Sequence, residues 1–262
     1  MISITSAELN AWLAAFIWPL TRVLAVIASA PVLGDQSLPM RVKIGLAALI
    51  TFIVAPTLGP LPQEDPGSAA GLLILAQQLV IGLAIGFAMR IVFVAVEMAG
   101  EIAGLQMGLG FASFYDPQNF AYTPVIGQFL GLLTTLVFLS VNGHLMVLAA
   151  LAESFHAFPV SAEPLSSLSL RTLVEWGGKI FLAGLLLSLP LLAALLIANL
   201  ALGILTRAAP QLNLFAVGFP VTLSIGLLIL AVSLPYLASP LTRLIDEGLH
   251  MMLVVAQQAR AP

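Results

Sequence analysis

The side chains whose types and spacing could do chemistry are few, and the clearest group is a set of three charges. Arg90, Glu97 and Glu101 follow one another at steps of seven and four residues. On a helix, these steps place the three side chains near one face. Two interpretations stay open. The charges either pair with one another or sit at a membrane boundary, or they form a polar stripe that faces a subunit interface or an aqueous path.

The sequence contains no catalytic or metal-binding constellation beside these charges. His144 has no second histidine or carboxylate at metal-ligand spacing, so we expect a hydrogen-bonded interior residue. Gly108-Leu109-Gly110 falls short of the dinucleotide-binding pattern, because Ser113 stands where a third glycine is needed. The absence of cysteine excludes thiolate chemistry, and the 12 acidic residues are scattered. We expect a protein that is not an enzyme and that holds no cofactor or metal.

The composition is that of an integral membrane protein. Hydrophobic residues make up 60% of the chain and charged residues 8%, whereas a soluble domain carries about a quarter charged residues. A length of 262 residues accommodates roughly six or seven membrane spans and no large soluble domain. The net charge of -3, without a polybasic block, argues against nucleic-acid binding through a basic surface.

We expect an all-α fold of about six apolar helices, nearly all interrupted by proline or glycine. The expected segments are residues 9–33, 44–58, 72–111, 124–151, 177–205 and a sixth that ends near residue 238. Pro19 should kink the first segment and Pro190 should break the fifth, because proline removes a helical hydrogen bond. Pro235 and Pro240 should end the sixth.

The tail that follows, residues 241–260, is amphipathic. Its apolar face consists of Leu241, Leu244, Ile245, Leu249 and Met252. Such a helix would suit a membrane surface or a partner helix.

Glycines four residues apart recur along the chain, and they share a helix face on which another helix can approach closely. They are Gly82 and Gly86, then Gly100, Gly104 and Gly108, then Gly127 and Gly131. We expect Gly100 and Gly104 to lie at a helix-packing interface, together with the three charges named above.

The stretch 104–118, GLQMGLGFASFYDPQ, lies between two long apolar segments and organises the chain. Its glycines weaken a regular helix, and the Asp116-Pro117 pair marks a stop, because proline pushes the preceding residue out of the helical region. Irregular backbone at membrane depth is tolerated only where protein covers it or where it lines a cavity. The stretch is therefore either a packed re-entrant turn or a constriction in a pathway.

The distribution of charge gives a weak signal for orientation. Arg41 and Lys43 favour a cytoplasmic first connection, opposite the acidic turn at residues 64–65. Arg171 and Lys179 then fall on the wrong side of a simple six-span arrangement, so we expect segments that are not plain spans.

Two function classes fit these patterns: a subunit of a membrane conduit for a large or extended substrate, and a small-molecule transporter. A transporter predicts two halves with matching broken helices. The sequences that flank Pro19 and Pro190 do not resemble each other. The glycine faces favour a chain that contacts many neighbouring helices.

The segment 101–117, EIAGLQMGLGFASFYDP, resembles the central motif of the FliR family, whose members are subunits of the flagellar type III export gate. The N-terminal pattern of Arg22, Pro31 and residues 39–41 agrees with that family, as does a second motif at residues 207–220. The matching residues of the second motif are Arg207, Pro210, Gln211, Asn213, Phe215, Gly218, Phe219 and Pro220. The resemblance covers essentially the whole chain. The paralogous injectisome export gate subunits share the pattern, but the motifs are closer to the flagellar family.

The resemblance implies a FliP-like helical portion, residues 1–174, followed by a FliQ-like helical hairpin, residues 175–262, with the amphipathic tail. It implies one such subunit completing a helical channel with several FliP-like and FliQ-like subunits, with an FlhB-like subunit around the base. The assembly would sit in the bacterial inner membrane, in the flagellar basal body, partly above the membrane plane. Unfolded flagellar proteins would pass through it.

The resemblance also implies that the loop 106–116 projects into the central channel and helps to plug it. The residues that face or support the closure would be Gln106, Met107, Phe111, Phe114 and Tyr115. Gly108 and Gly110 would allow the turn, and Asp116 and Pro117 would end it. Flexible methionine and bulky aromatic side chains can seal against a partner without covalent fixing. Tyr115 departs from the smaller aliphatic residue that the family pattern has at this position.

Overall fold

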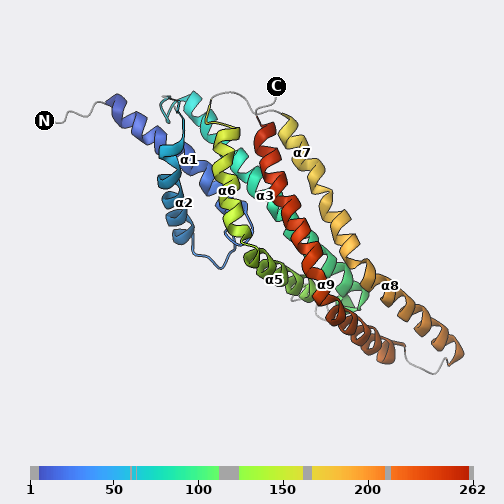
Figure 1. Cartoon of the computed structure of the whole chain (residues 1–262). Helices are drawn as coiled ribbons and strands as arrows, with labels where there is room; N and C mark the ends of the chain where they lie inside the picture. Colours follow the sequence, from blue (N-terminus) through green and yellow to red (C-terminus); the bar gives the residue numbers. More distant parts are fainter. Residues whose placement is uncertain are drawn as a thin grey trace. The chain divides into compact units, whose positions relative to one another are not determined.

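The computed structural model describes residues 6–59, 61–62, 64–111, 124–161, 167–209 and 214–259 (Figure 1). These residues form helices and no strand, which confirms the expected all-α class. The α-helices are α1 (Ser6–Ser29), α2 (Met40–Val54), α3 (Ala69–Gln106), α5 (Val125–Ser140), α6 (Gly143–Ala157), α7 (Ser167–Gly177), α8 (Lys179–Ala208) and α9 (Leu214–Gln258), with short 3-10 helices η1 (Ala55–Thr57) and η2 (Leu109–Phe111).

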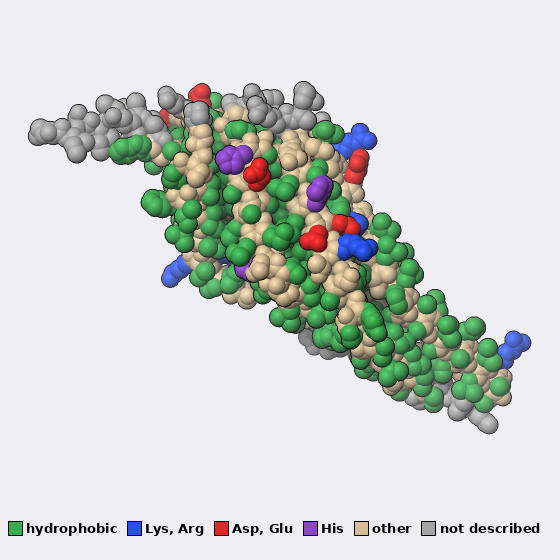
Figure 2. Space-filling model, viewed as in Figure 1, with side chains coloured by type: hydrophobic (Ala, Val, Ile, Leu, Met, Phe, Trp, Pro, Cys, Tyr) green, Lys and Arg blue, Asp and Glu red, His purple; other side chains and the backbone are tan. Residues whose placement is uncertain are grey.

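Among the described residues, five helices are long and apolar enough to cross a membrane, or six if the bent pair α5–α6 counts as one span. Apolar side chains cover much of the face that Figure 2 shows. This number of helices agrees with the expected integral membrane protein.

The fourth apolar segment is broken, which contradicts the single helix predicted over residues 124–151. The axes of α5 and α6 differ in direction by 69°. The break lies at Asn142, whose φ of 58° and ψ of 28° place it in the left-handed region that asparagine tolerates better than most residues. At the neighbouring Gly143, a Cβ atom would run into the ring of Phe138, so the tight turn requires a glycine.

The predicted ends at proline are wrong. Helix α8 continues through Pro190, and α9 runs for 45 residues through Pro220, Pro235 and Pro240. A proline removes one hydrogen bond, whereas ending a helix inside an apolar environment would expose many more backbone groups. The amphipathic tail is therefore the last part of α9. All five residues of its apolar face are buried within the chain, so no outside surface is needed to cover them.

The chain forms two compact units, each built from segments that are distant in sequence. The first contains Met1–Ile91, Phe138–Gly177 and Ile245–Pro262. The second contains Val92–Val137 and Gly178–Leu244.

Within the first unit, α1 and α3 run parallel and touch through glycine. A Cβ atom at Gly82 would lie 2.5 Å from the carbonyl oxygen of Arg22, and one at Gly86 would lie 2.9 Å from the carbonyl oxygen of Val26. These close approaches set the spacing of the two helices.

Candidate functional site

The C-terminal end of α3 carries the predicted helix contact. A Cβ atom at Gly100 would lie 2.6 Å from Cα of Gly127 in α5, and one at Gly127 would lie 2.9 Å from the carbonyl oxygen of Glu97. At Gly104 the added atom would be 3.6 Å from Cγ1 of Ile126, which is an ordinary van der Waals distance. The closest approach of α3 and α5 is therefore at Gly100, one turn before Gly104.

The helix then turns at Met107 and Gly108, so the predicted loop begins after Gln106 and not at Gly104. The amide of Gly108 donates to the carbonyl oxygen of Leu105 at 3.0 Å. The φ of Gly108 is 88°, in a region that L-residues rarely adopt, so the turn requires glycine. Gly110 follows in η2, and Gln106 is half-buried.

Met107 is the anchor of this turn. Its side chain is fully buried, in a cluster with Ala103, Ile126, Leu191 and Leu195. The position fixes the root of the stretch 106–116, because moving Met107 would open a cavity in the second unit. Met107 is one of the residues predicted to plug a channel, and its side chain is packed inside the chain.

Helix α9 holds Met107 through two residues that sequence reasoning missed. The hydroxyl of Thr222 lies 3.3 Å from the carbonyl oxygen of Met107 and 3.1 Å from those of Gly218 and Phe219, so these three acceptors share its single proton. A Cβ atom at Gly226 would lie 2.5 Å from Cγ of Met107, so the absence of a side chain there makes room for the methionine. A signal was available, because Gly218, Thr222 and Gly226 are small residues four apart, and all three are buried.

Several predicted residues lie outside the described residues. They are Phe114, Tyr115, Asp116, Pro117, Pro210, Gln211 and Asn213. Phe111 and Phe215 are described by their helical backbone alone. In the second motif, Arg207 is exposed in the last turn of α8, where a cation complements the helix dipole, and Phe219 and Pro220 are exposed in α9.

The three charges of α3 are all exposed, and they have different surroundings. The carboxylate of Glu97 lies beside α5, since a Cβ atom at Gly131 would be 3.1 Å from its Oε1. Arg90 lies near the connection between α1 and α2. There the pKa of Asp35 is lowered chiefly by hydrogen bonds from Ser37, and more weakly by the positive charges of Lys43 and Arg90.

Arg22 carries a buried charge at the centre of the first unit, and its side chain is completely inaccessible. Nε donates to Oε1 of Gln78 at 2.8 Å, Nη1 to the carbonyl oxygen of Ser154 at 2.9 Å, and Nη2 to that of Phe158 at 2.9 Å. The guanidinium also lies 4.3 Å from the centroid of the Phe155 ring. The carbonyl oxygens at the end of α6 carry the negative end of its dipole, and they stabilise the charge.

The described residues contain no group of three or more potential metal ligands. His144 is half-buried, and its Nδ1 is buried without a hydrogen-bond partner in the described part of the chain. The expected hydrogen bond is therefore not formed at that atom.

Comparisons with known proteins agree with the motifs. The family model described as bacterial export proteins, family 1, matches residues 13–248. The flagellar biosynthetic protein FliR of Escherichia coli K12 is 45% identical over 252 residues, which cover 96% of each chain. The FliR of Pectobacterium carotovorum is 43% identical over 98% of each chain, and that of Bacillus subtilis is 31% identical over 83% of this chain and 85% of its own. The chain therefore belongs to family 1 of the bacterial export proteins and, within it, to the FliR family.

Proposed function

We propose that the chain is a subunit of the flagellar type III protein export gate in the bacterial inner membrane. It completes a helical channel with FliP-like and FliQ-like subunits, with an FlhB-like subunit at the base, and unfolded flagellar proteins pass through that channel. Residues 1–174 act as the FliP-like portion and residues 175–262 as the FliQ-like hairpin. The loop 106–116 helps to close the channel at rest, and the energy for transport comes from other components.

The observation that carries the plug proposal is the anchoring of Met107. A loop that blocks a channel needs a root that does not move when its tip is displaced. Met107 is buried, its carbonyl oxygen is one of three acceptors within reach of the Thr222 hydroxyl, and Gly108 reverses the chain directly after it. These contacts support a rigid base at Met107, from which the short segment with Phe111, Phe114 and Tyr115 extends.

The apolar surface of α8 and α9 supports the proposed assembly. Only 17% of the apolar window of α9 and 28% of the window that contains α8 are buried inside the chain. Side chains that are more than half exposed include Ile197, Leu200, Ile204, Leu228 and Val232. A surface of this kind is covered by lipid or by neighbouring helices, and a hairpin with two apolar sides suits a position between neighbouring subunits.

The plug is tested by replacing residues 112–116 with a Gly-Ser segment of equal length, which leaves Met107 and Gly108 in place. Conductance of the assembled complex in planar bilayers should rise well above that of the unchanged complex. A matched control replaces residues 35–38, the exposed connection between α1 and α2, in the same way. Baseline conductance from a fully assembled loop variant would contradict the plug.

The assembly is tested separately by purifying the tagged chain from detergent-solubilised native membranes and identifying the bound proteins by mass. FliP-like and FliQ-like subunits should be recovered in a stable complex. Recovery of a folded chain without bound subunits would contradict the proposed export gate and favour a small-molecule transporter.

A further inference from the structure

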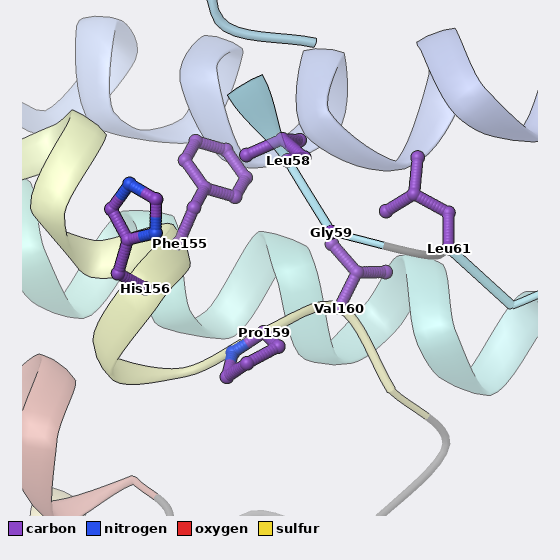
Figure 3. Close-up of a pocket in the computed structure, with 7 residues that line it drawn as sticks. All are labelled: Leu58, Gly59, Leu61, Phe155, His156, Pro159 and Val160. Atoms are coloured by element: carbon purple, nitrogen blue, oxygen red, sulfur yellow. The ribbon is translucent and has the colours of Figure 1, made fainter. Parts of the chain in front are cut away.

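A pocket of about 360 Å³ lies in the first unit (Figure 3). One wall is the segment that follows η1, with Leu58, Gly59 and Leu61. The other wall is the end of α6 and the residues after it, where the exposed His156 and Pro159 lie beside the buried Phe155 and Val160. The volume is near the lower end of the range for ligand pockets, so it suits one large side chain better than an extended ligand.

The wall from α6 is held in place by Arg22. The guanidinium lies against the ring of Phe155 and binds the carbonyl oxygen of Phe158, directly before the lining residues Pro159 and Val160. Phe155 and Val160 are themselves nearly inaccessible, at 3% and 6% exposure. The pocket is therefore preformed, and an incoming group would not have to order it.

The charged residues that flank both walls of the pocket in the sequence are acidic. Both walls come from stretches, residues 44–89 and 91–170, that contain no lysine or arginine. Glu153 is exposed one turn before the lining residue His156, and Glu64 and Asp65 are exposed shortly after Leu61. The buried Arg22 does not present its charge at this surface. Most of the residues that line the pocket are thus apolar, His156 is the polar one among those described, and acidic residues flank both walls in the sequence.

The place of the pocket in the chain favours a protein occupant over a lipid chain. The candidate span in α2 ends at Thr57, directly before Leu58, and the other wall consists of the last turn of α6, which ends at Ala157, and the residues that follow Phe158. Both walls therefore lie at the ends of apolar helices. Acidic residues beside these helix ends would repel anionic headgroups and attract lysine or arginine.

We propose that this pocket receives one apolar side chain, of the size of leucine or phenylalanine, from a partner protein in which lysine or arginine flanks that residue. The apolar side chain fills the space between the two walls. The flanking cations lie against Glu64, Asp65 and Glu153. The inference concerns a different surface from the plug loop, and it stands if the plug fails.

The absence of cysteine in the chain permits a clean binding assay. A fluorophore is attached through Ala149→Cys, an exposed position on α6 that does not line the pocket. The probe is a capped peptide, Lys-Lys-Phe-Lys-Lys, that carries a quencher and is added to the full chain in detergent. Quenching should saturate, and peptides with alanine for phenylalanine or glutamate for lysine should bind at least tenfold more weakly.

Two glycines provide a matched pair of variants. A Cβ atom at Gly59 meets nothing within 4 Å, and the same is true at Gly45 on α2. Gly59→Leu should fill the pocket and abolish saturable quenching, whereas Gly45→Leu should bind as the parent does. Glu153→Lys, which leaves the pocket open, should weaken binding about tenfold.

Three results would overturn the proposal: unchanged binding to the Gly59→Leu variant, equal binding of the glutamate peptide, or displacement of the lysine peptide by a lysophospholipid at equal concentration. The last would identify an acyl chain as the occupant. Circular dichroism of each variant shows whether the fold is intact.

Discussion

The helices around Arg22 and the helices α8 and α9 differ in how much of their apolar surface the chain itself covers. In the apolar window of α3, 67% of the residues are buried inside the chain. The charge of Arg22 is fully buried, and groups from α3 and α6 accept its hydrogen bonds. In the window of α9, the buried share is 17%. The packing of the first region is fixed by its own polar contacts and by the close approach of helices at glycine. The second packs on Met107 and buries the last part of α9, but the apolar window of α9 is mostly exposed and depends on what surrounds it.

The largest expected effect breaks the self-contained region. Arg22→Met leaves two buried carbonyl oxygens and Oε1 of Gln78 without their donor, and unfilled buried acceptors are costly. At about 1–3 kcal/mol for each acceptor left unsatisfied, we expect a loss of at least about 3 kcal/mol in the free energy of unfolding, measured by thermal or denaturant unfolding in detergent.

Two further variants sharpen this prediction. Arg22→Lys should recover only part of the loss, because an ammonium cannot match the planar fork of the guanidinium. Arg90→Ala, at an exposed position on α3, should change stability by less than about 0.5 kcal/mol. Equal losses at Arg22 and Arg90 would contradict the difference between the buried and the exposed charge.

The second effect concerns the close helix contact in the second unit. Gly100→Ala pushes a methyl group into the backbone of Gly127, and we expect about 1–3 kcal/mol of destabilisation. Gly104→Ala finds room at 3.6 Å, and the better helix propensity of alanine should make it neutral or stabilising by about 0.5–1 kcal/mol. Paired thermal melts test this, and equal effects at the two glycines would contradict the closer approach of the helices at Gly100.

A smaller effect is expected at the anchor of the turn. Thr222→Val keeps the shape of the side chain and removes the hydroxyl that the carbonyl oxygen of Met107 shares with those of Gly218 and Phe219, so we expect a loss of about 0.5–1.5 kcal/mol. Hydrogen exchange at Gly108 should accelerate in the same variant. Thr206→Val, at an exposed position on α8, is the matched control and should leave both quantities unchanged.

The smallest effect on the isolated chain is expected on α8. Leu200→Ser changes a side chain that is 67% exposed, so the unfolding temperature in detergent should hardly move. The yield of the assembled complex should fall, if neighbouring subunits cover this surface as proposed. A fall in the stability of the isolated chain, with a normal yield of the complex, would show that the chain itself and not a neighbouring subunit covers Leu200.

Apolar length and composition were enough to predict the membrane class, the all-α fold and a long third helix, although α3 spans Ala69–Gln106 and not residues 72–111. The break at Asn142 was visible as a polar interruption, but the left-handed backbone there depends on the contact between Gly143 and Phe138. Pro235 and Pro240 were interpreted as helix ends, because the loss of a helical hydrogen bond at proline can be predicted from the sequence. The free-energy cost of exposing the backbone groups of an ended helix depends on the apolar environment, which the sequence does not show.

The candidate site was less predictable, because its contacts join distant segments. The glycine spacing predicted a close helix approach, but only the structure places it at Gly100. The bonds of Arg22 span 56, 132 and 136 residues, and no local pattern specifies such partners. Thr222 lies 115 residues from Met107, and its role depends on the register of α9.

The way in which Arg22 is held has a consequence for the conditions under which the fold persists. A buried arginine held by carboxylates loses its partners when acid protonates them. Here the acceptors are two backbone carbonyls, the amide oxygen of Gln78 and the hydroxyl of Ser154, none of which takes up a proton in a physiological range. The centre of the first unit should therefore be indifferent to acidification of either compartment, and a proton gradient across the membrane can rise and collapse without loosening it.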